Sequence, residues 1–185
     1  MMKNVFLLFG LAVFGAISCK TIDPDTLPSH MTLGQTYYTQ YSLKYEKGRH
    51  RTTNYRKGML LPVNSEVTLT KIDRKRVFVT IGSSGQELII ENVPKHTNTD
   101  AYQAFDRIFA PNKVDLSGFT ADERNNIMSG AVAAGMRKKA VLVAIGFPPE
   151  VETPNLDMNQ WKYWANRWNT FIVHFEGDRV VRIQD

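Results

Sequence analysis

Apolar and polar residues alternate between about residues 37 and 94, with the period of two that a half-buried β-strand requires. Val67 and Leu69 alternate with polar neighbours, and turn-forming residues at 73–75 and 82–85 separate the runs that follow. The apolar positions of these later runs are Val77, Val79, Ile81, Leu88 and Ile90. Several short strands at a spacing of roughly ten residues predict a small β-barrel or sandwich.

The period becomes helical after Pro94. Three candidate N-caps at 97–99 precede a helix that should end before Pro111 and whose apolar face carries Ala101, Phe105, Ile108 and Phe109. Residues 120–123, Thr-Ala-Asp-Glu, have the spacing of a capping box, in which the Thr hydroxyl and the Glu carboxylate each accept an orphan backbone N–H. They predict a second helix that ends near Gly135.

A third helix is predicted over about 137–145, with Gly146 as its left-handed terminator. Strands are predicted at 161–164, 170–176 and 179–184, and the last two flank a tight Gly177-Asp178 turn. Helices that precede strands, instead of alternating with them, favour an antiparallel sheet. The expected fold class is α+β: a small β-barrel module, followed by a module of two to three helices and a three-stranded antiparallel sheet.

The amino terminus has the pattern of an export signal. An uncharged apolar run at 5–17 follows Lys3; it is shorter than the roughly 20 residues that span a membrane and fits a secretory leader. Cys19 is the only cysteine, so a disulfide within the chain is impossible. Residues 16–19, Ala-Ile-Ser-Cys, resemble the lipobox of bacterial lipoproteins, whose cysteine is lipidated. In that family an Asp after the cysteine favours the inner membrane, so Lys20 points to the outer membrane.

This resemblance implies a signal peptide over residues 1–18 and a lipid anchor on Cys19. Two acyl chains suffice for stable anchoring. Residues 19–36, rich in Pro, Asp, Thr and Ser, are then a tether, followed by a β-rich domain at 37–95 and an α+β domain at 96–185. We expect the protein to face the periplasm from the outer membrane.

The second half carries an ordered set of motifs, namely Gly135-Met136, Val141, Ile145-Gly146-Phe147-Pro148, Trp161-Lys162-Tyr163 and a final hairpin. This order resembles outer-membrane lipoproteins of the BamE/SmpA type, although Arg137 stands where that family has a capping Ser or Thr. The resemblance implies partners among β-barrel assembly components and a role in outer-membrane protein assembly or envelope integrity. Residues 58–67 resemble the entry to an SH3-like barrel.

Positive charge is concentrated in one stretch. The chain carries a formal net charge of +5, and residues 44–57 hold six Lys or Arg against one Glu. One interpretation is a solvated hairpin. The other is an anion-binding loop that faces anionic lipid head groups or an acidic partner, with Arg49, Arg51, Arg56 and Lys57 as candidates. Nucleic acid is not expected as a partner in an exported protein.

Aromatic residues crowd the predicted strand at 161–164 and the turn after it. Trp161 and Tyr163 are expected to cover the helices, because aromatic side chains mostly fill cores. The neighbouring positions are expected to be exposed and to suit a protein contact. The candidate partner-binding residues are Trp164, Arg167 and Trp168.

Catalytic and metal-binding motifs are absent from the sequence. The four histidines, at 30, 50, 96 and 174, lack metal-ligand spacing, and neither Gly-x-Ser-x-Gly nor His-Glu-x-x-His occurs. We therefore expect a non-enzymatic scaffold or binding protein without cofactor or metal. The alternative is an envelope ligand-binding module that recognises cell-wall peptide or anionic lipid.

Overall fold

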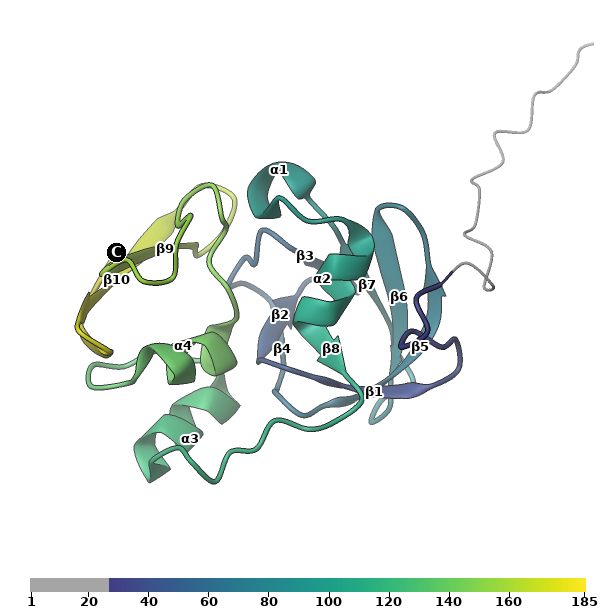
Figure 1. Cartoon of the computed structure of the whole chain (residues 1–185), viewed down its shortest axis with the longest axis horizontal. Coiled ribbons are helices and arrows are strands. Elements are labelled where there is room, and N and C mark those ends of the chain that lie inside the picture. Colours follow the sequence, from purple (N-terminus) through teal and green to yellow (C-terminus); the bar gives the residue numbers. More distant parts are fainter. Residues whose placement is uncertain (1–26) are drawn as a thin grey trace, which may run out of the picture.

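The computed structural model describes residues 27–185, and the predicted signal peptide, the predicted lipidation site Cys19 and residues 19–26 of the predicted tether lie outside this range. The described chain is a mixed α+β fold (Figure 1). A curled six-stranded sheet forms one half, and a three-stranded antiparallel sheet packed on helices forms the other. The α+β class predicted from the sequence is therefore confirmed.

The six-stranded sheet has the strand order β3-β7-β6-β5-β1-β8. Its neighbours are antiparallel except for the parallel pair β3 and β7. The predicted alternation is confirmed, since Val67, Leu69, Val79 and Leu88 are fully buried. The strands are β1 (Thr36–Thr39), β3 (Arg49–Arg51), β5 (Glu66–Ile72), β6 (Arg76–Ile81), β7 (Glu87–Glu91) and β8 (Phe109–Ala110).

A two-stranded sheet stands beside it, made of β2 (Leu43–Tyr45) and β4 (Met59–Leu61). β2 and β3 follow one another through a tight turn in which Lys47 and Gly48 both have positive φ, the geometry of a hairpin turn. The two strands then take different partners, β4 for β2 and β7 for β3. This divergence places both strands along one side of the cleft described below.

Two short helices follow β7: α1 (Pro94–Thr97) and α2 (Ala101–Ile108). The predicted caps at 97–99 are wrong, because Asp100 caps α2: its carboxylate accepts from Gln103 N, and the Gln103 side chain accepts from Asp100 N. The predicted apolar face of this helix is buried, and it packs in the same core cluster as the six-stranded sheet. A T-shaped contact between Phe105 and Tyr37, with ring centroids 4.9 Å apart, belongs to this cluster.

The capping box at Thr120 and Glu123 is confirmed and opens α3 (Ala121–Ser129). The predicted end near Gly135 is wrong. The helix stops at Ser129 because Gly130 takes a left-handed conformation, φ 63° and ψ 37°, and closes the final turn.

The third predicted helix is α4 (Lys138–Ile145). Gly146 ends it with a φ of 77° but a ψ of −169°, so the expectation of a left-handed helical terminator is wrong in ψ. Arg137 precedes this helix without a side-chain cap. Its backbone N–H instead donates to Glu123 Oε1 at 3.0 Å, so that a carboxylate from α3 satisfies the start of α4.

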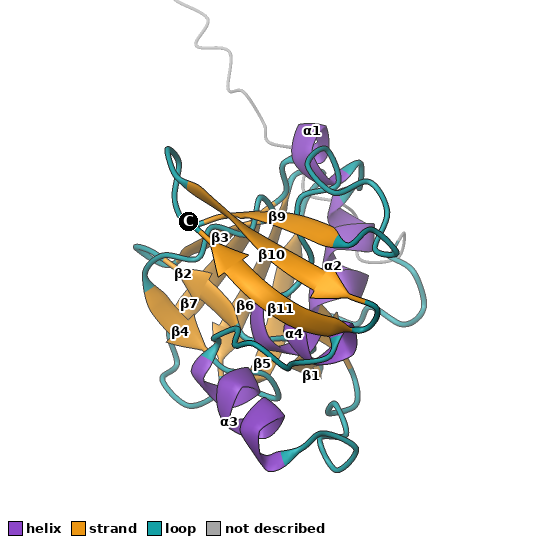
Figure 2. Ribbon diagram, turned by 90° about the vertical axis from the view of Figure 1, so that its left-hand side faces the viewer, coloured by secondary structure: helices purple, strands orange, loops and turns teal. Residues whose placement is uncertain are grey.

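The predicted three-stranded sheet is present as β9 (Gln160–Trp164), β10 (Thr170–Glu176) and β11 (Arg179–Gln184), with β10 in the centre (Figure 2). Trp161 and Tyr163 are fully buried in a second core cluster with the apolar face of α4, as predicted. Alternation along β9 turns Trp164 towards the opposite face.

The two halves are joined by buried hydrogen bonds. Ser42 Oγ donates to the Ile127 carbonyl at 2.7 Å. Asn54 Nδ2 donates to the carbonyls of Ile145 and Phe147, at 2.7 and 2.9 Å. These bonds satisfy carbonyls at the ends of α3 and α4, so the segment before β2 and the loop after β3 both hold the second half in place.

Candidate functional site

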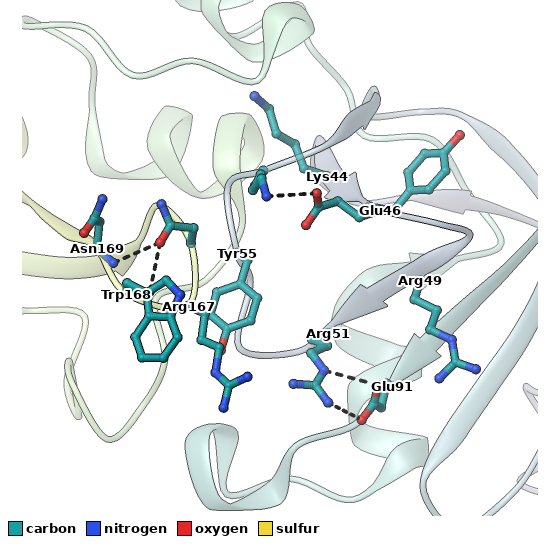
Figure 3. Close-up of a pocket in the computed structure, with 12 residues that line it drawn as sticks. Lys44, Glu46, Arg49, Arg51, Tyr55, Glu91, Arg167, Trp168 and Asn169 are labelled. Atoms are coloured by element: carbon teal, nitrogen blue, oxygen red, sulfur yellow. Dashed lines mark hydrogen bonds and ion pairs between the residues drawn. The ribbon is translucent and has the colours of Figure 1, made fainter.

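A cleft of about 470 Å³ lies where the β2–β3 region meets the β9–β10 loop (Figure 3). One side comes from β2, β3, the loop after β3 and the end of β7. The other side comes from the β9–β10 loop. The lining residues are Lys44, Tyr45, Glu46, Arg49, Arg51, Tyr55, Lys57, Glu91, Asn166, Arg167, Trp168 and Asn169.

The cleft joins most of the predicted site residues. Arg49, Arg51 and Lys57 of the predicted anion-binding set line it together with Arg167 and Trp168 of the predicted partner-binding set. From the sequence, these residues were predicted to form two separate sites in different domains. The fold makes them neighbours because the β9–β10 loop reaches over the loop that follows β3.

The charges of the lining are only partly compensated. Five cationic side chains face two carboxylates. Arg51 forms a two-pronged ion pair with Glu91, at 2.8 and 3.2 Å. The pair of Lys57 with Glu46, at 3.3 Å, is solvent-exposed on both sides. The cations of the cleft without an ion pair among the described residues are Lys44, Arg49 and Arg167.

Trp168 is 81% exposed although its loop is well ordered by hydrogen bonds. The Asn166 side chain accepts from the backbone N–H groups of Trp168 and Asn169, at 2.8 and 3.1 Å. The Asn169 carbonyl in turn accepts from Ala165 N at 2.9 Å. The Arg167 guanidinium lies 5.1 Å from the centre of the indole ring. These hydrogen bonds fix the backbone of the turn, so the backbone that carries the indole and the guanidinium has little freedom to lose on binding.

Tyr55 connects this turn to the basic side of the cleft. In Figure 3 its ring lies between Trp168 and the Arg51–Glu91 pair. Its edge also meets the ring of Trp164, with centroids 6.3 Å apart and planes at 69°. Trp164, a predicted partner-binding residue, is half-buried and does not line the cleft, so it supports Tyr55 from behind.

Arg56, predicted to bind anions, is turned inward instead. Its Nη1 donates to the carbonyls of Ser42 and Ile145, at 3.2 and 3.1 Å, and to Asn54 Oδ1 at 3.1 Å. Its Nη2 reaches the Gly130 carbonyl at 3.4 Å. Burial lowers the pKa of Arg56 to about 10, which leaves the guanidinium charged at neutral pH. Its donors are occupied by carbonyls of both halves, so Arg56 binds the fold together.

His50 lies beneath the cleft and is buried on the inner side of β3. Its Nδ1 donates to the Lys44 carbonyl at 2.8 Å, because a carbonyl can only accept. Burial lowers the pKa of His50 to about 4, so the ring is neutral at physiological pH. The ring ties β3 to β2 and adds no charge to the cleft.

Residues 27–185 contain neither a metal-binding cluster nor a membrane-spanning helix. No group of three or more His, Cys, Asp or Glu side chains within that range is arranged to hold a metal ion. None of the helices there is long and apolar enough to cross a membrane.

Sequence reasoning missed part of the lining. Lys44 and Tyr55 belong to the basic stretch at 44–57, and membership of that stretch was the only signal that the sequence offered for them. Glu91 and Asn169 carried no signal, because their proximity to the basic strand depends on the fold.

Comparisons of the chain with protein families, with curated proteins and with solved structures give no match.

Proposed function

We propose that the protein is an outer-membrane-anchored, periplasm-facing lipoprotein that acts as a non-catalytic scaffold or binding protein. The observation that carries this proposal is the cleft, in which an exposed Trp168 and three cations that form no ion pair within residues 27–185 converge from distant parts of the chain. Tryptophan and arginine are enriched at the energetic centres of protein interfaces. An anionic partner is the complement of such a lining.

The anchor half of the proposal rests on the lipobox resemblance around Cys19. An SH3-like β-rich half and a BamE-like second half remain proposals for the finer identity of the two parts. The motif order along residues 135–164 and the final hairpin support a role near outer-membrane protein assembly or envelope integrity. β-barrel assembly components are then the partners we propose.

A second candidate is an envelope ligand-binding module for cell-wall peptide or anionic lipid. The observation that favours it is the concave shape and polar lining of the cleft, because small ligands bind in concave sites with a few convergent polar groups. Both candidates use the same cleft. They differ in the chemical class of the molecule found there.

The anchor is tested with Cys19→Ala. Incorporation of radiolabelled fatty acid and membrane fractionation are compared between this variant and the wild type. We expect the wild type to be labelled and to sediment with membranes, and the variant to lose both properties, because no other residue offers a thiol. A variant that is labelled and sediments like the wild type would refute the lipoprotein assignment.

The cleft is tested by photo-crosslinking in cells. The photoreactive amino acid p-benzoylphenylalanine is placed at Trp168 and, as a control, at the exposed Arg74 on the turn between β5 and β6, which does not line the cleft. We expect position 168 to form crosslinks that disappear when Arg49→Gln and Arg167→Gln are added. Position 74 should not form these crosslinks. Crosslinks that ignore both substitutions would refute the cleft as the binding site.

A further inference from the structure

We propose that the cleft binds an acidic peptide segment of a partner protein in which carboxylates adjoin an aromatic or apolar side chain. This inference rests on the proposed function, because it names the ligand of the same cleft. It follows from three properties of the lining: the number of cations without an ion pair among the described residues, the exposed indole on a hydrogen-bonded turn, and the two carboxylates that lie among the cations.

The unpaired cations set the charge of the ligand. Lys44 lies on β2, Arg49 on β3 and Arg167 on the β9–β10 loop, so the three approach the cleft from different elements. Arginine binds carboxylates through two parallel hydrogen bonds. A ligand with two or three carboxylates distributed along an extended chain can meet these positions.

The aromatic groups set the second part of the ligand. Trp168 is 81% exposed, and Tyr55 lines the same cleft. Covering an exposed aromatic ring with an apolar or aromatic group removes apolar surface from water and so favours binding. Tryptophan and tyrosine residues contribute much of the binding energy of protein interfaces. Because Asn166 fixes the turn, the backbone that presents the indole is in place before the ligand arrives.

Two carboxylates argue for a peptide over a membrane surface. Glu46 and Glu91 lie among the cations and neutralise Lys57 and Arg51. A uniformly anionic surface is attracted by each nearby cation but would also be repelled by both carboxylates. A peptide can place its carboxylates at the unpaired cations and keep them away from the two glutamates. The mixed lining therefore favours a patterned ligand.

The test is an unbiased selection. The full chain in detergent is used to select binders from a random peptide library displayed on phage, and the enriched peptides are synthesised for affinity measurements. We expect enriched peptides to place acidic residues beside an aromatic or apolar one. Their affinity should fall at least about tenfold with Lys44→Gln, Arg49→Gln and Arg167→Gln combined, and also with Trp168→Ala.

A matched control removes the same charge elsewhere. Arg74, Lys75 and Lys95 are exposed and lie outside the cleft, so the combined change of all three to Gln should alter affinity by less than about twofold. Near-ultraviolet circular dichroism verifies that each variant keeps its fold. The lost charge is then the same in both triple variants, and only its position differs.

Other outcomes overturn the inference. No enrichment, enrichment of peptides without acidic residues, or binding that the cleft variants leave unchanged would each refute it. Vesicles with and without phosphatidylglycerol are assayed in parallel. Vesicle binding that depends on Arg49 and Arg167, without peptide enrichment, would refute the peptide and leave the cleft as a lipid site. Loss of the crosslinks at position 168 as well would also refute the proposed function.

Discussion

Gly146 lies directly against the ring of Tyr41: a Cβ on Gly146 would stand 2.6 Å from Tyr41 Cδ2. The two residues come from different halves of the fold, since Tyr41 belongs to the first core cluster and Gly146 ends α4 of the second. Gly146 also has a φ of 77° and a ψ of −169°, a region that is almost restricted to glycine. The junction of the halves therefore requires glycine at this position for two independent reasons.

The first prediction is that Gly146→Ala destabilises the whole described fold. The backbone conformation costs about 1–3 kcal/mol with a side chain, and overpacking against Tyr41 costs about 1–3 kcal/mol more. The free energy of unfolding from urea titration should fall by at least about 2 kcal/mol. The control is Gly135→Ala, because Gly135 also has a positive φ, of 86°, but a new Cβ there would meet open space, so the change adds backbone strain without a steric clash. Equal losses in the two variants would contradict a steric role for Tyr41.

The second prediction separates Arg56 from its basic neighbours. Arg56→Gln leaves four oxygen acceptors without their cationic donor, so the free energy of unfolding should fall by about 2–4 kcal/mol. Arg49→Gln removes an exposed cation that has no ion pair in the described part of the chain, so the free energy of unfolding should change by less than about 0.5 kcal/mol. Urea unfolding of both variants decides the assignment. A larger loss for Arg49→Gln would reverse it.

The periodicity of apolar residues predicted the strands and helices themselves better than the residues at which they end. Strands β5, β6 and β7 follow from alternation, because each has one face in the core. The capping box at residues 120–123 correctly predicted where α3 begins. The end of α3 was misplaced because Gly130 and Gly135 both have positive φ, and only the packing around them decides which one ends the helix.

The site could be predicted only in pieces. The basic stretch and the exposed Trp168 are properties of local sequence. The cleft itself depends on the approach of the β9–β10 loop to the loop after β3, which no local pattern encodes. The sequence also could not separate Arg56 from Arg49, because the carbonyls that hold Arg56 belong to residues 42, 130 and 145.

The third prediction concerns acid stability. Glu123 is 3% exposed, and its carboxylate accepts from Arg137 Nε and Nη2, at 2.9 and 2.6 Å. The pKa of Glu123 is lowered to about 2, mainly by the hydrogen bonds from the Arg137 side chain. A carboxyl whose pKa is lower in the folded state stabilises the fold above its unfolded pKa of about 4.3, and this stabilisation is lost as the pH falls towards 2.

Glu123→Gln keeps the capping-box hydrogen bond and removes the charge. The variant should be less stable than the wild type by about 2–3 kcal/mol near pH 7, and this difference should shrink steadily between about pH 5 and pH 2. The control is Glu87→Gln, at an exposed position outside any ion pair in the described chain. Thermal or urea unfolding at a series of pH values measures both. A difference that stays constant with pH would contradict the role of the charge.

The last prediction tests the positive potential of the cleft without any ligand. Trp168 is the most exposed of the three tryptophans and has the Arg167 guanidinium over its ring. A local positive potential concentrates anions, so iodide should quench its fluorescence at least about twofold more efficiently than caesium at low ionic strength. High salt should reduce this preference, because it screens exposed charges.

Trp168→Phe should abolish the preference, because Trp161 is buried and Trp164 is shielded by Tyr55. Arg49→Gln with Arg167→Gln should lower it, whereas the triple change at Arg74, Lys75 and Lys95 should leave it unchanged. The control variant removes three positive charges and the cleft variant removes two. A larger effect of the cleft variant would therefore reflect the position of the charges and not the net charge. Equal quenching by iodide and caesium in the wild type would show that Glu46 and Glu91 neutralise the cleft, and an acidic ligand would then lack its electrostatic basis.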